Sequence, residues 1–182
     1  MPFESLDDPD HLYFVTASII KWNHLFFDEK YARVILDTFT FYRNKKELLI
    51  FAFVIMPSHF HAIIKPLNIS IGKFLQSYGS FSAHKIIKML KEESRTKDLG
   101  IFHKHRRDLR SNYSIWQEIF TENIFSEKFL EQKLEYIHQN PINKDVDSVV
   151  DRADFIYSSA RYYDYGDKPI IEIDDIRDYL TS

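Results

Sequence analysis

The sequence predicts one α+β domain built on a ferredoxin-like antiparallel sheet with helices on one face. The chain has 182 residues, enough for one buried core, and 45% of them are apolar. Strand-like and helix-like segments follow one another in the order strand, helix, strand, strand, helix, strand, helix. Two of the strand-like segments are separated only by Pro57 and Ser58, as is typical of an antiparallel hairpin.

The first quarter of the chain predicts a strand followed by a helix. Residues 1–10 carry four acids and no base, and we expect a loose acidic N-terminal lead-in. Residues 11–20 read HLYFVTASII, and their aromatic and β-branched side chains predict the first strand. Residues 22–27 form a connection that could cover a cleft. Asp28 is placed to cap a helix that extends to about Lys46, with apolar residues at helical spacing.

A hairpin follows at the centre of the predicted sheet. Residues 48–56 are almost continuously apolar, which predicts a central strand covered on at least one face. Residues 59–65 return as its partner, and Pro66 ends that strand. In a ferredoxin-like order the first and third strands are central neighbours. We therefore expect residues 59–65 to lie in the middle of the sheet.

The next predicted elements are a helix and a basic loop. Ser70 is placed to cap a helix that extends to Lys91, although Gly79 interrupts its pattern without a clear reason. A glycine weakens a helix by up to about 1 kcal/mol relative to alanine. Residues 92–112 are polar and basic and predict a mobile loop.

The last predicted elements are a strand, a helix and an extension. Residues 114–120, SIWQEIF, predict a further strand, and Ser126 is placed to cap a third helix that runs towards Pro141. Residues 146–182 form an aromatic-rich C-terminal extension, which we expect to pack on the domain or to trail from it. No internal repeat is evident.

Composition limits the classes of protein. The absence of cysteine excludes disulfides and thiolate metal sites. The longest apolar run, residues 48–56, is too short to cross a bilayer, and the acidic start does not have the pattern of a secretion signal. We expect a soluble cytoplasmic protein with no membrane partner.

The net charge of −3 hides an uneven distribution. Residues 83–110 carry nine Lys or Arg against four acids, and local fields govern the attraction of phosphates. A local basic surface of this kind is compatible with nucleic-acid binding, although a solvated loop is the equal alternative. Trp116 could be a base-stacking platform or a core residue. The candidate nucleic-acid-binding residues are Lys85, Lys88, Lys104, Arg106, Arg107, Arg110 and Trp116.

Two histidines begin the strand at the centre of the sheet. Because side chains alternate along a strand, His59 and His61 share one face while Phe60 points to the other. Two imidazoles so placed can bind one metal ion, and the alternative is a pair on a solvated face. A second such pair, His103 and His105, lies among basic residues that oppose a cation. We interpret it as a solvated or phosphate-facing patch.

The third helix contains LEYIHQNP. At about 100° per residue, Tyr136 and Asn140 lie together on one shoulder of its apolar stripe, and His138 lies on the opposite shoulder. Tyrosine can act as a covalent nucleophile, and an amide oxygen can be a third metal ligand. Asn140 precedes Pro141, which disfavours helical geometry, so Gln139 or His138 are alternative ligands. A tyrosine at the edge of the core and a histidine that caps the helix are the structural alternatives.

Four segments, MPSHFHAII, IWQEIF, LEYIHQNPI and YSSARYY, resemble the HUH single-tyrosine transposases. The branch they resemble most is that of the REP-associated tyrosine transposases, relatives of insertion-sequence transposases. The resemblance covers roughly residues 11–165. It implies that His59 and His61 bind Mg²⁺ or Mn²⁺ and that Tyr136 attacks single-stranded DNA, leaving a 5′-phosphotyrosine link and a free 3′-hydroxyl. Asn140 occupies the position where the insertion-sequence branch has Gln and this branch Asn.

The resemblance implies a catalytic domain over residues 11–145 and a folded, hairpin-forming single strand of DNA as substrate. A monomer or a homodimer is expected, since insertion-sequence relatives can exchange the tyrosine helix whereas the REP-associated branch includes monomers. The leading hypothesis is a metal-dependent DNA strand transferase. A domesticated, non-catalytic hairpin-binding protein is the alternative. A metal-dependent barrel hydrolase ranks lowest, because that fold needs about 250 residues.

Overall fold

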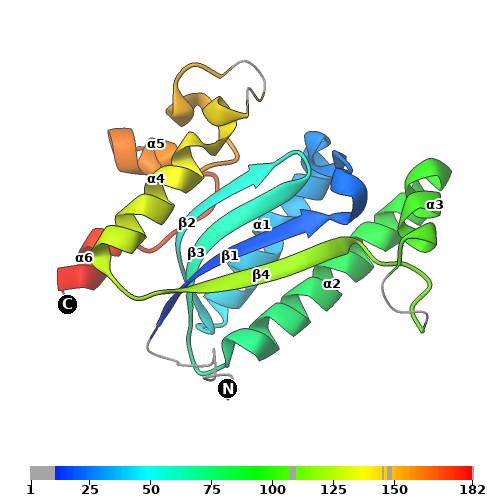
Figure 1. The fold of residues 1–182 in the computed structure, drawn as a ribbon, viewed down its shortest axis with the longest axis horizontal. Helices are drawn as coiled ribbons and strands as arrows, with labels where there is room; N and C mark the ends of the chain where they lie inside the picture. The colour runs from blue at the N-terminus through cyan, green and yellow to red at the C-terminus, as the bar shows by residue number, and fades with distance from the viewer. Residues whose placement is uncertain (1–10, 107–109, 145, 147–148, 182) are drawn as a thin grey trace.

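The structure is a computed structural model that describes residues 11–106, 110–144, 146 and 149–181. The predicted lead-in at residues 1–10 and the candidate Arg107 lie outside the described residues. Within the described part, helices pack on both faces of one four-stranded sheet (Figure 1).

The sheet consists of β1 (Leu12–Ile19), β2 (Leu48–Met56), β3 (His59–Pro66) and β4 (Trp116–Ile124). Its strand order is β2-β3-β1-β4, and all three neighbouring pairs are antiparallel. This is the order of a ferredoxin-like sheet, so the predicted α+β class is confirmed. The first and third strands are central neighbours, as predicted.

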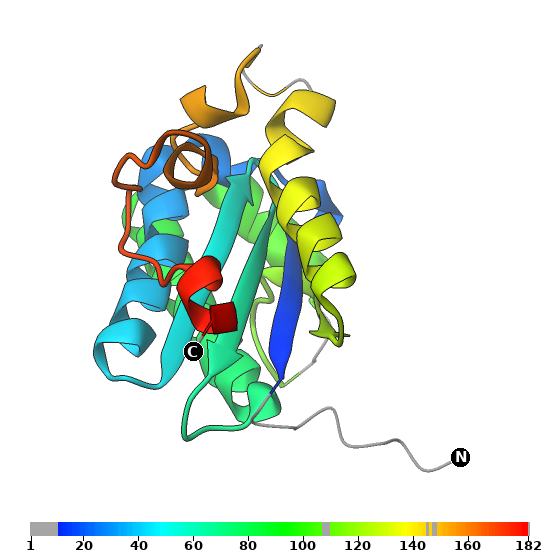
Figure 2. The ribbon, with the colours of Figure 1, turned by 90° about the vertical axis from the view of Figure 1, so that its left-hand side faces the viewer.

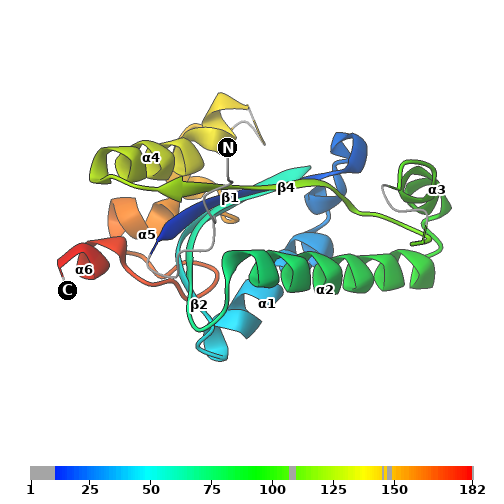
Figure 3. The ribbon, with the colours of Figure 1, turned by 60° about the horizontal axis from the view of Figure 1, so that its bottom comes forward.

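The prediction that the helices lie on one face of the sheet is wrong, because two long helices cover one face and a third buries its apolar side chains against the other. Helices α1 (Glu29–Asn44) and α2 (Ile71–Glu92) lie on one side, and α4 (Glu127–Asn143) lies on the opposite side (Figures 2 and 3). Two apolar clusters result, one with Val15 of β1 and one with Phe14. Because both faces are buried, β2 is apolar along almost its whole length.

The three predicted N-caps are confirmed. The side chains of Asp28, Ser70 and Ser126 each accept a hydrogen bond from a backbone N–H in the first turn of α1, α2 and α4. Each bond satisfies a donor that the helix itself leaves without a partner. The first turns therefore begin where the sequence indicates.

The prediction of a loop over residues 92–112 is wrong in part, because residues Thr96–Lys104 form helix α3. Phe102 is fully buried in the cluster under α1 and α2, and Leu99 packs against that cluster. These two residues have the i, i+3 spacing of a helix face, which the surrounding charges obscured.

The fourth strand is longer than the predicted range of 114–120. Thr121, Glu122 and Asn123 pair with β1 and extend it to Ile124. An edge strand with one half-open face carries polar side chains, so its hydrophobic pattern is weak. The weak pattern explains why the predicted strand ended at residue 120, before the observed end of β4.

Gly79 has a structural reason that the sequence did not reveal. Helix α2 continues through it, and a Cβ atom at this position would lie 2.9 Å from Cδ1 of Ile119 on β4. The indole nitrogen of Trp116 also donates a hydrogen bond to the Gly79 carbonyl at 3.2 Å. The glycine therefore lets α2 approach the edge strand closely.

The described part of the C-terminal extension packs along β2. The backbone N–H of Ile55 donates to the carbonyl of Tyr157 at 2.8 Å, and that of Ser159 donates to the carbonyl of Phe53 at 3.0 Å. This segment leads into α5 (Ala160–Tyr165) and, further on, α6 (Ile176–Thr181). It covers backbone groups that an edge strand would otherwise expose. No helix in the described residues is long and apolar enough to span a membrane.

Candidate active site

The two histidines of β3 lie side by side on the face that α4 covers. Their ring centroids are 4.9 Å apart, and His61 lies opposite Thr16 of the neighbouring strand β1. His61 is buried and His59 is partly exposed. Phe60 points into the core on the other face, so the predicted alternation holds.

The Nδ1 atoms of both histidine rings lie within hydrogen-bond distance of neighbouring hydroxyl groups. Oγ1 of Thr16 is 2.7 Å from Nδ1 of His61, and Oγ of Ser58 is 3.3 Å from Nδ1 of His59. A histidine that donates its Nδ1 hydrogen to such an oxygen keeps the Nε2 lone pair for another partner. Nε2 of His61 is buried and has no hydrogen-bond partner among the described residues. This atom is therefore a candidate metal ligand.

Burial keeps both imidazoles neutral at pH 7. It lowers the pKa of His59 to about 4, an effect that the side chain of Asn140 partly opposes. The pKa of His61 is lowered to about 3, mainly by burial and in smaller part by electrostatic interactions with His59 and with the ammonium group of Lys133. The neutral imidazole is the form that binds a metal ion.

Helix α4 places Tyr136 beside this pair in the same chain. The Tyr136 ring centroid is 5.1 Å from that of His61 and 5.9 Å from that of Phe14. The side chain is 45% exposed. It therefore adjoins the histidines and remains accessible to a large substrate.

Asn140 lies one helical turn after Tyr136. Helix α4 continues through Pro141, so Asn140 retains helical placement despite the proline that follows it. The residue is buried, and its Oδ1 atom has no hydrogen-bond partner among the described residues. Its side chain interacts with His59. An acceptor oxygen buried beside the neutral imidazole of His59 suits a cation.

The two alternative ligands have other partners. Nε2 of Gln139 donates to Glu135 on its own helix at 3.0 Å. Nε2 of His138 is 2.9 Å from Oγ of Ser159 in the C-terminal extension, and burial lowers the pKa of His138 to about 4. Of the three candidates, Asn140 is the one whose buried side-chain oxygen has no partner among the described residues, and its role as the third ligand stays a prediction.

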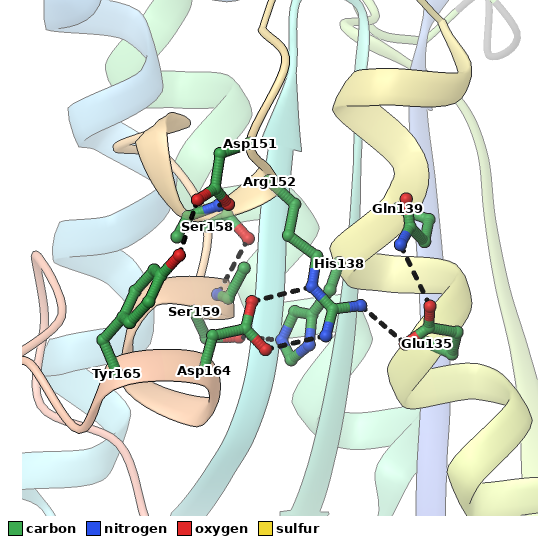
Figure 4. A network of polar contacts seen from close by, with 11 residues as sticks. Glu135, His138, Gln139, Asp151, Arg152, Ser158, Ser159, Asp164 and Tyr165 are labelled. Carbon is green, nitrogen blue, oxygen red and sulfur yellow. Dashed lines mark hydrogen bonds and ion pairs between the residues drawn. The ribbon is translucent and has the colours of Figure 1, made fainter.

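A polar network joins the opposite shoulder of α4 to the C-terminal extension (Figure 4). Arg152 donates to Glu135 of α4 at 2.6 Å and, through two nitrogens, to Asp164 of α5 at 2.7 Å. Ser159 links His138 to the backbone of β2, because its hydroxyl also contacts Phe53. The extension thus holds the helix that carries Tyr136.

The histidines and Tyr136 line an open cleft of about 540 Å³. Phe14 and Thr16 of β1 contribute to it, as does Trp22 in the connection that follows β1. The remaining lining side chains belong to the edge strand, to α4 and to the residue that caps the C-terminus of α4: Glu118, Phe120, Glu122, Lys133 and Lys144.

The donor set in this cleft is small. Within the part of the chain that the structure describes, no group of three or more His, Cys, Asp or Glu residues is arranged to hold a metal ion. A cation here would need the amide oxygen of Asn140 together with His59 and His61. The two orphaned atoms, Nε2 of His61 and Oδ1 of Asn140, fit that arrangement.

None of the described basic candidates lines the cleft. Lys85 and Lys88 lie on α2, across the sheet from the histidines, and pair with Asp37 and Glu92 at 3.4 Å and 3.8 Å. Trp116 packs against α2. Contact between DNA and the basic residues remains a prediction. The other described candidates, Lys104, Arg106 and Arg110, lie at or after the end of α3.

Apart from His59, His61 and Tyr136, the lining residues were not predicted from the sequence, and Lys133 and Trp22 show why. Lys133 lies three residues before Tyr136, and helical spacing could have placed both on one face. Trp22 belongs to the connection that was expected to cover a cleft, but no periodicity distinguishes it.

Fold and cleft together define a ferredoxin-like domain in which a helix sets a tyrosine beside a histidine pair on the sheet. No protein-family model and no curated protein matches this chain. Among solved structures, it is similar to a REP-associated tyrosine transposase bound to a REP hairpin. The TM-score is 0.64 at 16% identity, over 97% of this chain and 93% of the other.

A second similar structure is that of a transposase candidate from Deinococcus radiodurans. Its TM-score is 0.44 at 18% identity, over 70% of this chain and 88% of the other. The first likeness shows that this chain has the fold of a REP-associated tyrosine transposase, as the sequence resemblance implied.

Proposed function

We propose that this protein is a transposase, a metal-dependent DNA strand transferase that cleaves and rejoins single-stranded hairpin DNA through Tyr136. The observation that carries the proposal is the contact between Tyr136 and His61 within one chain, at 5.1 Å between ring centroids. The likeness to a transposase bound to a REP hairpin supports DNA as the substrate.

His59, His61 and Asn140 would hold the cation, with Mg²⁺ or Mn²⁺ as the expected ion. When bound, it would offset negative charge on the phosphodiester and orient it for in-line attack. Neutral imidazole and amide ligands leave the ion its full positive charge. This suits a cleft that must accept a polyanion.

In the proposed reaction, the Tyr136 hydroxyl oxygen attacks phosphorus, and the bond from phosphorus to the 3′ oxygen breaks. The phenolic proton is lost, and the departing 3′ oxygen takes up a proton. The product is a 5′-phosphotyrosine link and a free 3′-hydroxyl. A second 3′-hydroxyl can reverse these steps and rejoin the strand, because the phosphodiester energy is kept in the link.

Incubation with hairpin DNA and Mn²⁺ tests the proposal. The wild-type protein should form a covalent adduct, seen as a DNA-dependent shift in denaturing electrophoresis, and Tyr136→Phe should form none. Tyr157→Phe is a matched control outside the cleft and should keep the adduct. Hairpin binding without any adduct would instead identify a non-catalytic binding protein. An adduct that persists in Tyr136→Phe would overturn the assignment.

A further inference from the structure

An exposed tryptophan adjoins the histidine pair. The Trp22 ring lies edge-on to His59, with centroids 5.5 Å apart and an angle of 79° between the planes. With the contacts described above, the side chains form a row in the order Tyr136, His61, His59 and Trp22. A phosphodiester bound at the histidines would therefore have the indole near a flanking nucleotide.

The backbone holds this tryptophan in an unfavourable conformation. Lys21 and Trp22 are consecutive residues with φ of 57° and 50°, in the left-handed region. That region costs roughly 1–2 kcal/mol for each residue with a side chain. Such strain persists only where the surroundings enforce it, and it is concentrated at functional sites. Position 22 is therefore a candidate for a role beyond packing.

The neighbouring structure enforces this conformation from both sides. The backbone N–H of Lys21 donates to Oε1 of Gln117 on β4 at 3.1 Å. The amide of Asn23 donates to Asp98 on α3 at 3.0 Å. The indole is thus presented on a braced connection and yet is 54% exposed. A rigid aromatic ring loses little conformational entropy when a ligand stacks on it.

The chemistry of the cleft favours a nucleobase as the occupant. Phe120 on β4 is another exposed ring that lines the cleft, at 51% exposure. Lys133 and Lys144 bring positive charge to the same cleft, which Glu118 and Glu122 also line, and Lys133 pairs with Glu122 at 2.6 Å. Single-stranded nucleic acid combines flat apolar base faces with anionic phosphates. An apolar protein side chain would use the rings but not the lysines.

We propose that Trp22 stacks on an unpaired nucleobase of the single-stranded DNA, next to the phosphodiester at the histidine pair. The inference rests on the proposed function, since it assigns a base-binding subsite to the same cleft. Stacking on an aromatic ring accepts any base, so this subsite would recognise unpaired DNA rather than a sequence.

Intrinsic fluorescence tests the proposal, because the chain contains only two tryptophans. Trp116→Phe leaves Trp22 as the single reporter. A hairpin oligonucleotide with a single-stranded thymidine extension should quench it, and the same hairpin with an abasic extension should not. Trp22→Ala should weaken binding of the extended hairpin about tenfold to a hundredfold, the change expected for one stacked base. Trp22→Phe should recover most of the loss.

Phe81→Ala is the matched control, because this ring is 50% exposed on α2 and does not line the cleft. Its affinity for the extended hairpin should equal that of the wild type. Equal affinity of Trp22→Ala and wild type, or equal quenching by the abasic hairpin, would overturn the subsite. If Tyr136 still forms its adduct in that case, the proposed function stands. A wild-type protein that neither binds the hairpin nor forms the adduct overturns both.

Discussion

At the scale of single residues, Thr16 shows how the candidate site depends on a side chain that orients another one. Its hydroxyl is 2.7 Å from Nδ1 of His61 and thereby orients the ring and its tautomer. Replacement of a residue that orients a metal-binding histidine in this way commonly lowers metal affinity by about tenfold to a hundredfold. Nothing in the local pattern of β1 marks Thr16 for this role, because its partner lies 45 positions away.

Replacing Thr16 by valine should weaken Mn²⁺ binding about tenfold or more, because the buried Nδ1 of His61 loses its partner while the side-chain shape is kept. Isothermal titration calorimetry with Mn²⁺ measures the change. Thr121→Val is the control on the edge strand, where the residue pairs with Val15 and does not line the cleft. Unchanged Mn²⁺ affinity in Thr16→Val would contradict the role of His61 as a metal ligand.

At the scale of elements, the position of α4 depends on the C-terminal extension. One shoulder of the helix presents Tyr136 and Asn140 to the histidine pair, and the other binds the extension through His138 and Glu135. The alternation of shoulders follows from 3.6 residues per turn and could be predicted from LEYIHQNP alone. The partner of the second shoulder could not, since Ser159 becomes its neighbour only when the extension folds back over β2.

Ser159→Ala should lower the free energy of unfolding by about 1–3 kcal/mol. The fully buried Ser159 hydroxyl serves both Nε2 of His138 and the backbone N–H of Phe53, and its loss leaves buried polar groups without partners. Urea denaturation followed by circular dichroism gives the value. Ser80→Ala, at an exposed position of α2, should change the free energy by less than about 0.5 kcal/mol. Equal free energies of unfolding for the two variants would show that the hydrogen bonds of the Ser159 hydroxyl do not stabilise the fold.

At the scale of the whole molecule, the fold holds three histidines in the neutral form, two of them buried and one partly buried. Burial lowers the pKa values of His59, His61 and His138 to about 4, 3 and 4. In the unfolded chain a histidine titrates near 6.5, so below that pH the unfolded state binds protons that the folded state excludes. Stability therefore rises with pH over this range. It is fully present above about pH 6.5 and is lost as the pH falls towards 4.

Metal-free protein should accordingly unfold at lower urea concentration at pH 5 than at pH 7.5. His138 alone accounts for about 3 kcal/mol by pH 4, from its difference in pKa between the two states. Urea titrations at several pH values in the presence of a chelator measure how steeply the free energy of unfolding rises with pH. His138→Gln should reduce this slope. His84→Gln, at an exposed position of α2, should leave it unchanged. An identical slope in His138→Gln would show that this histidine is not held neutral by the fold.

The sequence by itself determined the ferredoxin-like order, three helix N-caps, the shared face of His59 and His61, and the shoulder that carries Tyr136 and Asn140. The order follows from the succession of strand-like and helix-like segments, and each of the others follows from the period of a single element or from residues within one turn. Only the tertiary structure decided that α4 covers the opposite face from α1 and α2, that residues 96–104 are helical, and that Trp22 lines the cleft. Those outcomes depend on contacts between segments distant in the chain, and no local pattern encodes such contacts.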